Sequence, residues 1–110
     1  MEAIAIPVLN GQKEAWMSFA KDLVGPRSAE FEDFNERMGL SAHKAWLQDT
    51  PEGSIVIAMH DGPGAHEFMA KLAQSDHSFD TWFRSSLEDI HGMNLSEPMP
   101  GESPQLLIDS

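Results

Sequence analysis

The chain of 110 residues has no cysteine and few positive charges. Without cysteine it has no disulfide, no thiolate nucleophile and no cysteine-ligated metal. Only 7 Lys and Arg stand against 18 Asp and Glu, which gives a formal net charge of -11. Such a balance repels phosphate backbones and anionic lipids, so we expect neither nucleic acid nor a membrane among the partners.

The sequence also has no long hydrophobic run. The N-terminal stretch "MEAIAIPVL" has an acidic second residue, and its apolar run is too short for a signal peptide or a membrane span. There is no nucleophile motif, phosphate-binding loop or nucleotide fingerprint. We therefore expect a cytoplasmic protein outside the commoner enzyme classes, and the sequence indicates no particular cofactor.

Short β-branched runs alternate with segments whose apolar residues recur every three or four positions, which is typical of a mixed α and β domain. Residues 1–110, with 41% hydrophobic residues, suit a single domain with one core. An irregular arm over 92–104 contains three of the seven prolines. We expect strands over 3–11, 41–48, 54–60 and 105–109, and helices over 12–24, 28–39, 65–74 and 79–92.

This order of elements predicts a ferredoxin-like βαββαβ fold. Such a fold has a four-stranded antiparallel sheet with helices on one face. Both crossover helices are expected to be interrupted, the first at Gly25-Pro26 and the second near "SDHS". Gly39 and Gly92 are expected to end helices.

The helix-free face of such a sheet must be polar or covered. The first and third strands are apolar on both sides, so we expect a homodimer in which about 800 Å² per partner is buried. The alternative is a monomer whose C-terminal arm folds over the bare face.

The stretches "RMGLSAHKAWLQDTPEGSIVIAM" and "SDHSFDTWFRSSLEDIHGMNL", with the terminal "LLID", resemble a small bacterial family of unknown function. This family belongs with the dimeric α/β-barrel proteins, in which two ferredoxin-like sheets face each other. The resemblance covers about residues 37–109 and implies the fold and dimerisation. It implies little about activity, because that superfamily includes small monooxygenases, haem-degrading enzymes, isomerases and ligand binders.

Two histidines flank the hairpin predicted around "DTPEG". If residues 50–53 form a four-residue loop, Asp49 pairs with Ser54 and His43 pairs with His60. Paired residues have Cβ atoms about 4.5–5.5 Å apart, so both imidazoles could hold one ligand or assist proton transfer. A loop one residue longer would place them on opposite faces.

In the favoured register, small residues share a face with these histidines. We expect Ala45 and Ala58, together with Ala3 and Ala5, to line the barrel interior and leave a ligand cavity. The bulky residues Ile4, Ile6, Val8, Ile55 and Ile57 are expected to meet the helices. The alternative is that the small face only allows close packing of subunits. The candidate catalytic residues are His43 and His60, and the candidate ligand-binding residues are Ala5, Ala45, Ala58, Trp46 and Arg84.

The other polar candidates are expected to play structural roles. A zinc or iron site would need a third ligand, and the spacing selects neither Asp61 nor Asp109, so no metal is predicted. Arg37 and Arg84 are expected to pair with surface carboxylates, although an arginine at the barrel mouth could bind an organic acid. The remaining histidines are expected to cap a helix (His91), lie in a loop (His77) and point to solvent (His66).

Three functions remain open. The first is binding of a small organic molecule between sheet and helices, with isomerase or cofactor-independent monooxygenase chemistry as a possible addition. The second is a binding module that senses or sequesters a metabolite without turnover. The third is a structural or interaction protein whose side chains fill the barrel.

Overall fold

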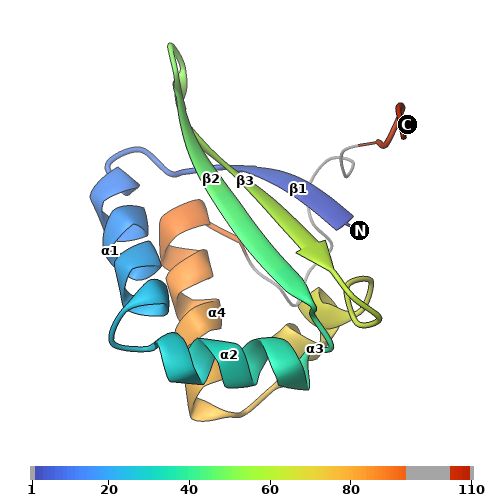
Figure 1. Ribbon diagram of the computed structural model, residues 1–110. Coiled ribbons are helices and arrows are strands. Elements are labelled where there is room, and N and C mark those ends of the chain that lie inside the picture. Colours follow the sequence, from blue (N-terminus) through green and yellow to red (C-terminus); the bar gives the residue numbers. More distant parts are fainter. Residues whose placement is uncertain (1, 94–104, 110) are drawn as a thin grey trace.

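The computed structural model describes residues 2–93 and 105–109 and shows a mixed α and β architecture (Figure 1). Within these ranges, no helix is long and apolar enough to cross a bilayer. The elements follow in the order β1 (Glu2–Pro7), α1 (Lys13–Val24), α2 (Ser28–Arg37), β2 (Ala42–Thr50), β3 (Gly53–Asp61), α3 (Phe68–Gln74) and α4 (Ser78–His91).

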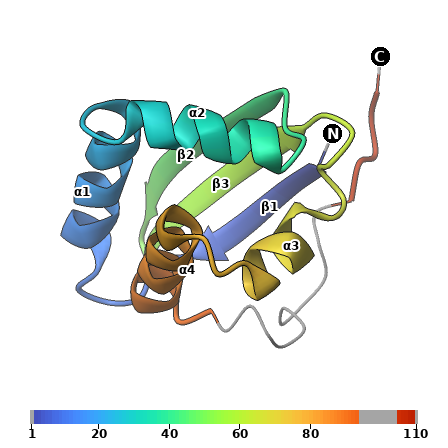
Figure 2. The same ribbon diagram turned by 90° about the horizontal axis from the view of Figure 1, so that it is seen from below.

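The three strands form one antiparallel sheet in the order β1-β3-β2, and the helices cover one of its faces (Figure 2). The β2–β3 hairpin has the predicted register, because Asp49 pairs with Ser54. Its loop is shorter than predicted, since Thr50 and Gly53 also pair and leave only two residues in the turn. The hydroxyl of Thr50 donates to the carbonyl of Gly53 (2.7 Å) and so closes the turn.

Both predicted interruptions of the crossover helices are present. The first crossover is split into α1 and α2 after Val24, and the second into α3 and α4. Gly92 ends α4 in the left-handed conformation, with a φ of 68°, and its N–H donates to the carbonyl of Glu88. Glycine adopts this conformation without the steric penalty of a Cβ.

The core lies between the helices and the sheet and is rich in aromatic rings. Phe34 of α2 is fully buried and stacks on Phe83 of α4, with ring centroids 4.7 Å apart. Phe19 of α1 contacts the same Phe83 ring at 5.2 Å. One ring of α4 therefore joins the first and second halves of the chain.

The loop before β2 and the loop after β3 touch backbone to backbone. The N–H of Gly64 donates to the carbonyl of Gly39 (2.9 Å). A Cβ added at Gly64 would lie 1.9 Å from the Met38 carbonyl oxygen, so only glycine fits there. This contact fixes the start of β2 against the end of β3, where the two histidines lie.

The predicted fourth strand is absent from the described part of the C-terminal segment. Residues 105–109 form no strand, and the side chains of Leu106, Leu107 and Ile108 are exposed. The sheet of the described residues therefore has three strands instead of four. The apolar cluster within residues 105–109 favours an extended segment. A strand also needs a neighbouring strand with a free edge to which it can form hydrogen bonds. The predicted arm over 92–104 lies outside the described residues apart from its first two positions.

The face assignment of the sheet was wrong in part. Ile4 pairs with Ala58, so it lies on the face of His43 and His60, and this face meets the helices. Ala5 pairs with Ile57 on the opposite, helix-free face. Both faces of β1 are apolar, so alternation gave no signal for choosing between them. Ala3 and Ala5 lie on the helix-free side, as predicted, but do not share it with the histidines. The residues on the side opposite to the predicted one are Ile55 and Ile57 on the helix-free side, and Ala45 and Ala58 on the helix side.

Candidate functional site

His43 of β2 and His60 of β3 are paired across the strands, as the register predicted. Their ring centroids are 4.6 Å apart in an edge-to-face arrangement. Phe31 of α2 lies 5.1 Å from the His43 ring, and Phe68 of α3 lies 4.4 Å from the His60 ring. The two imidazoles therefore lie side by side under aromatic rings of two helices.

One hydrogen bond fixes the His43 ring. Its Nδ1 lies 3.0 Å from Oδ1 of Asn35, on α2. Because an amide oxygen only accepts, Nδ1 carries the hydrogen and donates it. In the neutral ring, Nε2 then carries a lone pair and acts as an acceptor. His60 has no comparable hydrogen bond to a residue in the described ranges.

Both histidines are neutral at pH 7. Burial lowers the pKa of His43 to about 3, and the neighbouring charge of a protonated His60 lowers it further. Burial also lowers the pKa of His60 to about 4, although the carboxylate of Glu2 acts in the opposite direction. The pair therefore offers neutral hydrogen-bonding groups and no positive charge.

A cavity of about 190 Å³ lies beside these histidines, between the sheet and the helices. Side chains from all three strands and all four helices line it. Among the described residues that line it, none is Asp, Glu, Lys or Arg, and the side chains with hydrogen-bonding nitrogen or oxygen atoms are three imidazoles and the indole of Trp16. The exposed lining residues, Val24 of α1 and Ala45 of β2, mark where the cavity reaches the surface.

A third histidine lines the same cavity. His91, at the end of α4, is 8% exposed, and its Nδ1 donates to the carbonyl oxygen of Pro7 (2.9 Å). Its Nε2 is buried and has no hydrogen-bond partner in the described part of the chain. Burial lowers the pKa of His91, and the bond to Pro7 acts against this shift. The neutral ring therefore presents an unused acceptor.

The helix-capping role predicted for His91 was wrong, because its ring turns to β1 instead of the helix end. The sequence does contain a signal for this inward position. His91 follows Leu87 by four residues and so falls on the apolar stripe of α4.

The predicted ligand-binding residues do not all reach the cavity. Ala45 and Ala58 line it. Ala5 and Trp46 lie on the helix-free face, and Trp46 is 53% exposed there. Arg84 donates from Nη1 to the carbonyl oxygens of Leu72 and Ser75, so it joins α4 to the end of α3 instead of pairing with a surface carboxylate.

The two remaining histidines lie outside the cavity. His77 was expected in a loop and is the N-cap of α4, where its Nδ1 accepts a hydrogen bond from the Phe79 N–H (3.2 Å). His66 is exposed as predicted and contacts the carboxylate of Glu2.

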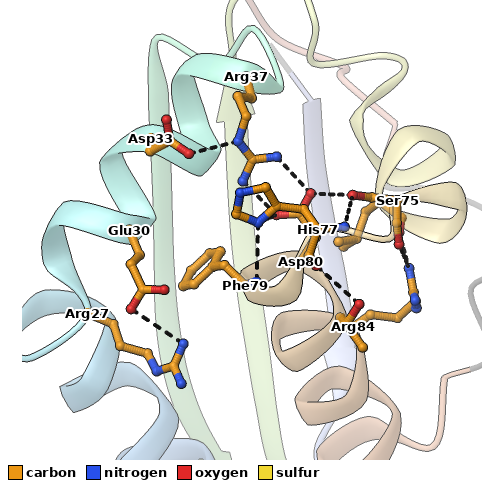
Figure 3. Close-up of polar contacts among 11 residues, drawn as sticks. Arg27, Glu30, Asp33, Arg37, Ser75, His77, Phe79, Asp80 and Arg84 are labelled. Carbon is orange, nitrogen blue, oxygen red and sulfur yellow. Dashed lines mark hydrogen bonds and ion pairs between the residues drawn. The ribbon is translucent and has the colours of Figure 1, made fainter.

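A second buried polar cluster joins α2 to α4 (Figure 3). The guanidinium of Arg37 donates two hydrogen bonds to the carboxylate of Asp80, each 2.8 Å long, and Asp80 is fully buried. Ser75 Oγ also donates to this carboxylate (2.6 Å). Burial alone would raise the pKa of Asp80, but the hydrogen bonds from Arg37 and Ser75 lower it. Arg37 also pairs with the exposed Asp33 (2.8 Å), as the sequence predicted.

Within residues 2–93 and 105–109, no three His, Asp or Glu side chains are close enough together to hold a metal ion. No protein-family model, curated protein or solved structure matches the chain. The geometry of the cavity is therefore the main guide to function.

Proposed function

We propose that this protein binds a small organic molecule in the cavity between the sheet and the helices, with His43 and His60 as polar contacts. The observation that carries the proposal is a largely apolar cavity beside two neutral imidazoles that lie edge to face. Binding sites for small molecules are mostly apolar and contain a few well-placed polar groups.

The size of the cavity limits the ligand. Its volume of about 190 Å³ is below the roughly 300–1,000 Å³ of common small-molecule sites. A cavity of about 150 Å³ lined by apolar side chains is nevertheless enough to bind benzene. The proposal is therefore for a ligand of about one aromatic ring and a short substituent.

The imidazole pair favours binding over proton transfer. A general base works best when its pKa lies near the working pH. The pKa values of about 3 for His43 and about 4 for His60 lie well below neutrality. The two rings are therefore suited to exchange hydrogen bonds with a ligand, and isomerase or cofactor-independent monooxygenase chemistry is the second candidate.

We propose further that the protein is a ferredoxin-like homodimer, in which two helix-free sheet faces pack together. The alternation of single strands with split crossover helices supports this fold. The helix-free face carries the half-exposed Trp46 and the aliphatic side chains of Ile55 and Ile57. Apolar side chains on a sheet face that no helix covers are typical of an interaction surface.

A thermal-shift screen with metabolite-sized compounds at pH 7.5 tests the binding proposal. The double variant His43→Phe/His60→Phe keeps aromatic rings but removes the imidazole nitrogens. The matched control is Lys44→Gln, because Lys44 follows His43 on β2 and points to the opposite face.

We expect at least one compound to raise the melting temperature of the wild type and of Lys44→Gln by several degrees. A shift of 4–8 °C corresponds to about 1 kcal/mol in a domain of this size. The same compound should have a much smaller effect on the double variant. A screen without any stabilising compound would favour the structural or interaction protein instead.

Sedimentation equilibrium at micromolar concentration tests the dimer. We expect twice the mass of the chain for the wild type and the mass of one chain for Trp46→Glu, because a buried unpaired carboxylate is unfavourable. A wild-type protein that sediments as a folded single chain would exclude the dimeric barrel.

A further inference from the structure

We propose that the ligand of this cavity is an uncharged molecule with an apolar body and a hydroxyl or N–H group that donates a hydrogen bond to Nε2 of His91. The inference rests on the proposed function, because it assigns the chemical class of ligand for the same cavity. It comes from a histidine at the opposite end of β1 from the His43–His60 pair.

The acceptor nitrogen of His91, Nε2, has no hydrogen-bond donor among the described residues. Its Nδ1 hydrogen is already donated to the Pro7 carbonyl, so the lone pair lies on Nε2. This atom is buried without a partner, in a residue that is only 8% exposed. Buried polar atoms nearly always have a hydrogen-bond partner, so an acceptor without one beside a cavity indicates a donor from outside the described residues.

The surroundings of His91 select an apolar body for the ligand. The ring lies 6.1 Å from that of Trp16, and Leu87 lines the cavity one helical turn earlier. Apart from the three histidines and the indole N–H of Trp16, no side chain with a hydrogen-bonding nitrogen or oxygen lines the cavity among the described residues. The rest of the ligand therefore meets hydrocarbon and aromatic surface.

The polar groups lie at two ends of the cavity. His60 pairs with Glu2 at the start of β1, whereas His91 bonds to Pro7 at its end. Glu2 and Pro7 are five residue steps apart, which is roughly 17 Å between backbone positions at about 3.3 Å per step. His43, His60 and His91 nevertheless line the same cavity, so their side chains approach it from both ends of β1.

The charge of the lining excludes ions. A carboxylate ligand would need a cation, and the cavity holds no Lys or Arg from the described ranges. Arg84, the arginine expected to bind an organic acid, instead donates to backbone carbonyls. An ammonium ligand would likewise lack a carboxylate, and an unpaired charge in such a site is strongly disfavoured.

Benzyl alcohol and ethylbenzene form a probe pair for this inference, since a hydroxyl in one replaces a methyl group of similar size in the other. Their dissociation constants are measured by NMR titration at pH 7.5 for the wild type, His91→Phe and His66→Phe. His66→Phe is the matched control, because it makes the same substitution at an exposed histidine outside the cavity.

We expect both compounds to bind the wild type. The affinity of benzyl alcohol relative to ethylbenzene should fall by about threefold to tenfold in His91→Phe, which is the usual effect of one hydrogen bond. The ratio should stay unchanged in His66→Phe. Benzoate should bind at least about tenfold more weakly than benzyl alcohol, because its charge finds no partner.

A measurement on the wild type covers the case in which His91→Phe fails to fold. The nitrogen-15 resonance of His91 Nε2 should move on addition of benzyl alcohol and stay in place on addition of ethylbenzene. An unchanged affinity ratio in a folded His91→Phe, or a resonance insensitive to both compounds, overturns the inference and leaves the proposed function standing. If neither compound binds the wild type, the proposed function fails as well.

Discussion

Two buried polar clusters of this protein differ in how completely they are satisfied. Around Asp80, both carboxylate oxygens accept hydrogen bonds from Arg37, and Ser75 adds another. Around the cavity, His43 uses one ring nitrogen on Asn35, and His91 leaves Nε2 without a partner. The Asp80 cluster is charged, and both carboxylate oxygens are hydrogen-bonded. The histidines around the cavity are neutral, and one of their ring nitrogens has no partner in the described part of the chain.

The Asp80 cluster has a structural role, and the cavity histidines have the features of a ligand-binding site. The Asp80 carboxylate is fully buried and accepts hydrogen bonds at both oxygens, so the Arg37–Asp80 pair fixes α2 against α4. Neutral rings with an unpaired acceptor nitrogen contribute little to the stability of the fold, and this nitrogen can accept a hydrogen bond from a ligand. The largest stability effects should therefore lie in the first cluster, and the largest binding effects in the second.

Removal of Arg37 should have the largest effect on stability. Arg37→Ala leaves the fully buried carboxylate of Asp80 without its cation, and breaking such a pair costs about 3–5 kcal/mol. Urea unfolding at pH 7.5 measures the loss. A loss below 1 kcal/mol would show that the cluster is not what fixes α2 to α4.

Acid should destabilise the fold through the cavity histidines. Their pKa values are lowered, so between the ordinary value of 6.5 and about 4 the unfolded chain binds protons that the folded chain excludes. Stability is fully present above pH 6.5 and should fall as the pH falls through this window. The loss is about 2 kcal/mol for each histidine at pH 5.

The pH dependence of unfolding in His43→Phe and His60→Phe checks this expectation. Each variant should lose about 2 kcal/mol of the difference in stability that the wild type shows between pH 8 and pH 5. A slope equal to that of the wild type would mean that these two rings titrate normally in the folded protein.

At pH 8 the substitution His60→Phe should change the unfolding free energy by less than about 1 kcal/mol. The ring is replaced by one of similar size, and His60 makes no hydrogen bond to another residue of the described ranges that would be lost. Ligand affinity should nevertheless fall. A large loss of stability with unchanged affinity would reverse the roles of the two clusters.

The smallest effect on stability is expected for a substitution of Asp33, the exposed partner of Arg37. Asp33 accepts from Arg37 Nε, but its side chain is 57% exposed. Exposed pairs contribute about 0–1 kcal/mol, so Asp33→Asn should remain within that range in urea unfolding. A loss as large as that of Arg37→Ala would place the important ion pair at the surface.

Most of the fold could be predicted from local patterns in the sequence. The turn residues "DTPEG" predicted the register that pairs His43 with His60, and the spacing of Phe31 and Phe34 predicted α2. The prediction of a strand over 105–109 was wrong, because a short apolar run does not show whether the edge of another strand is free to pair with it.

The site was only partly predictable, since it depends on contacts between distant residues. Arg37 and Asp80 are 43 residues apart, and no spacing rule joins them. The sequence could not show which face of the sheet meets the helices, because both faces of β1 are apolar. Two of the predicted ligand-binding residues, Ala5 and Trp46, lie on the face opposite to the cavity. His91 was assigned from its position at a helix end, although its spacing from Leu87 places it on the buried stripe.

Long-range proton–nitrogen NMR of the histidine side chains at pH 7 tests the central claim most directly. At pH 7 we expect His43, His60 and His91 to be neutral, each with one unprotonated nitrogen. On acidification, His43 should stay neutral until about pH 3 and His60 until about pH 4. Imidazolium signals from His43 or His60 at pH 7 would contradict a neutral, open cavity.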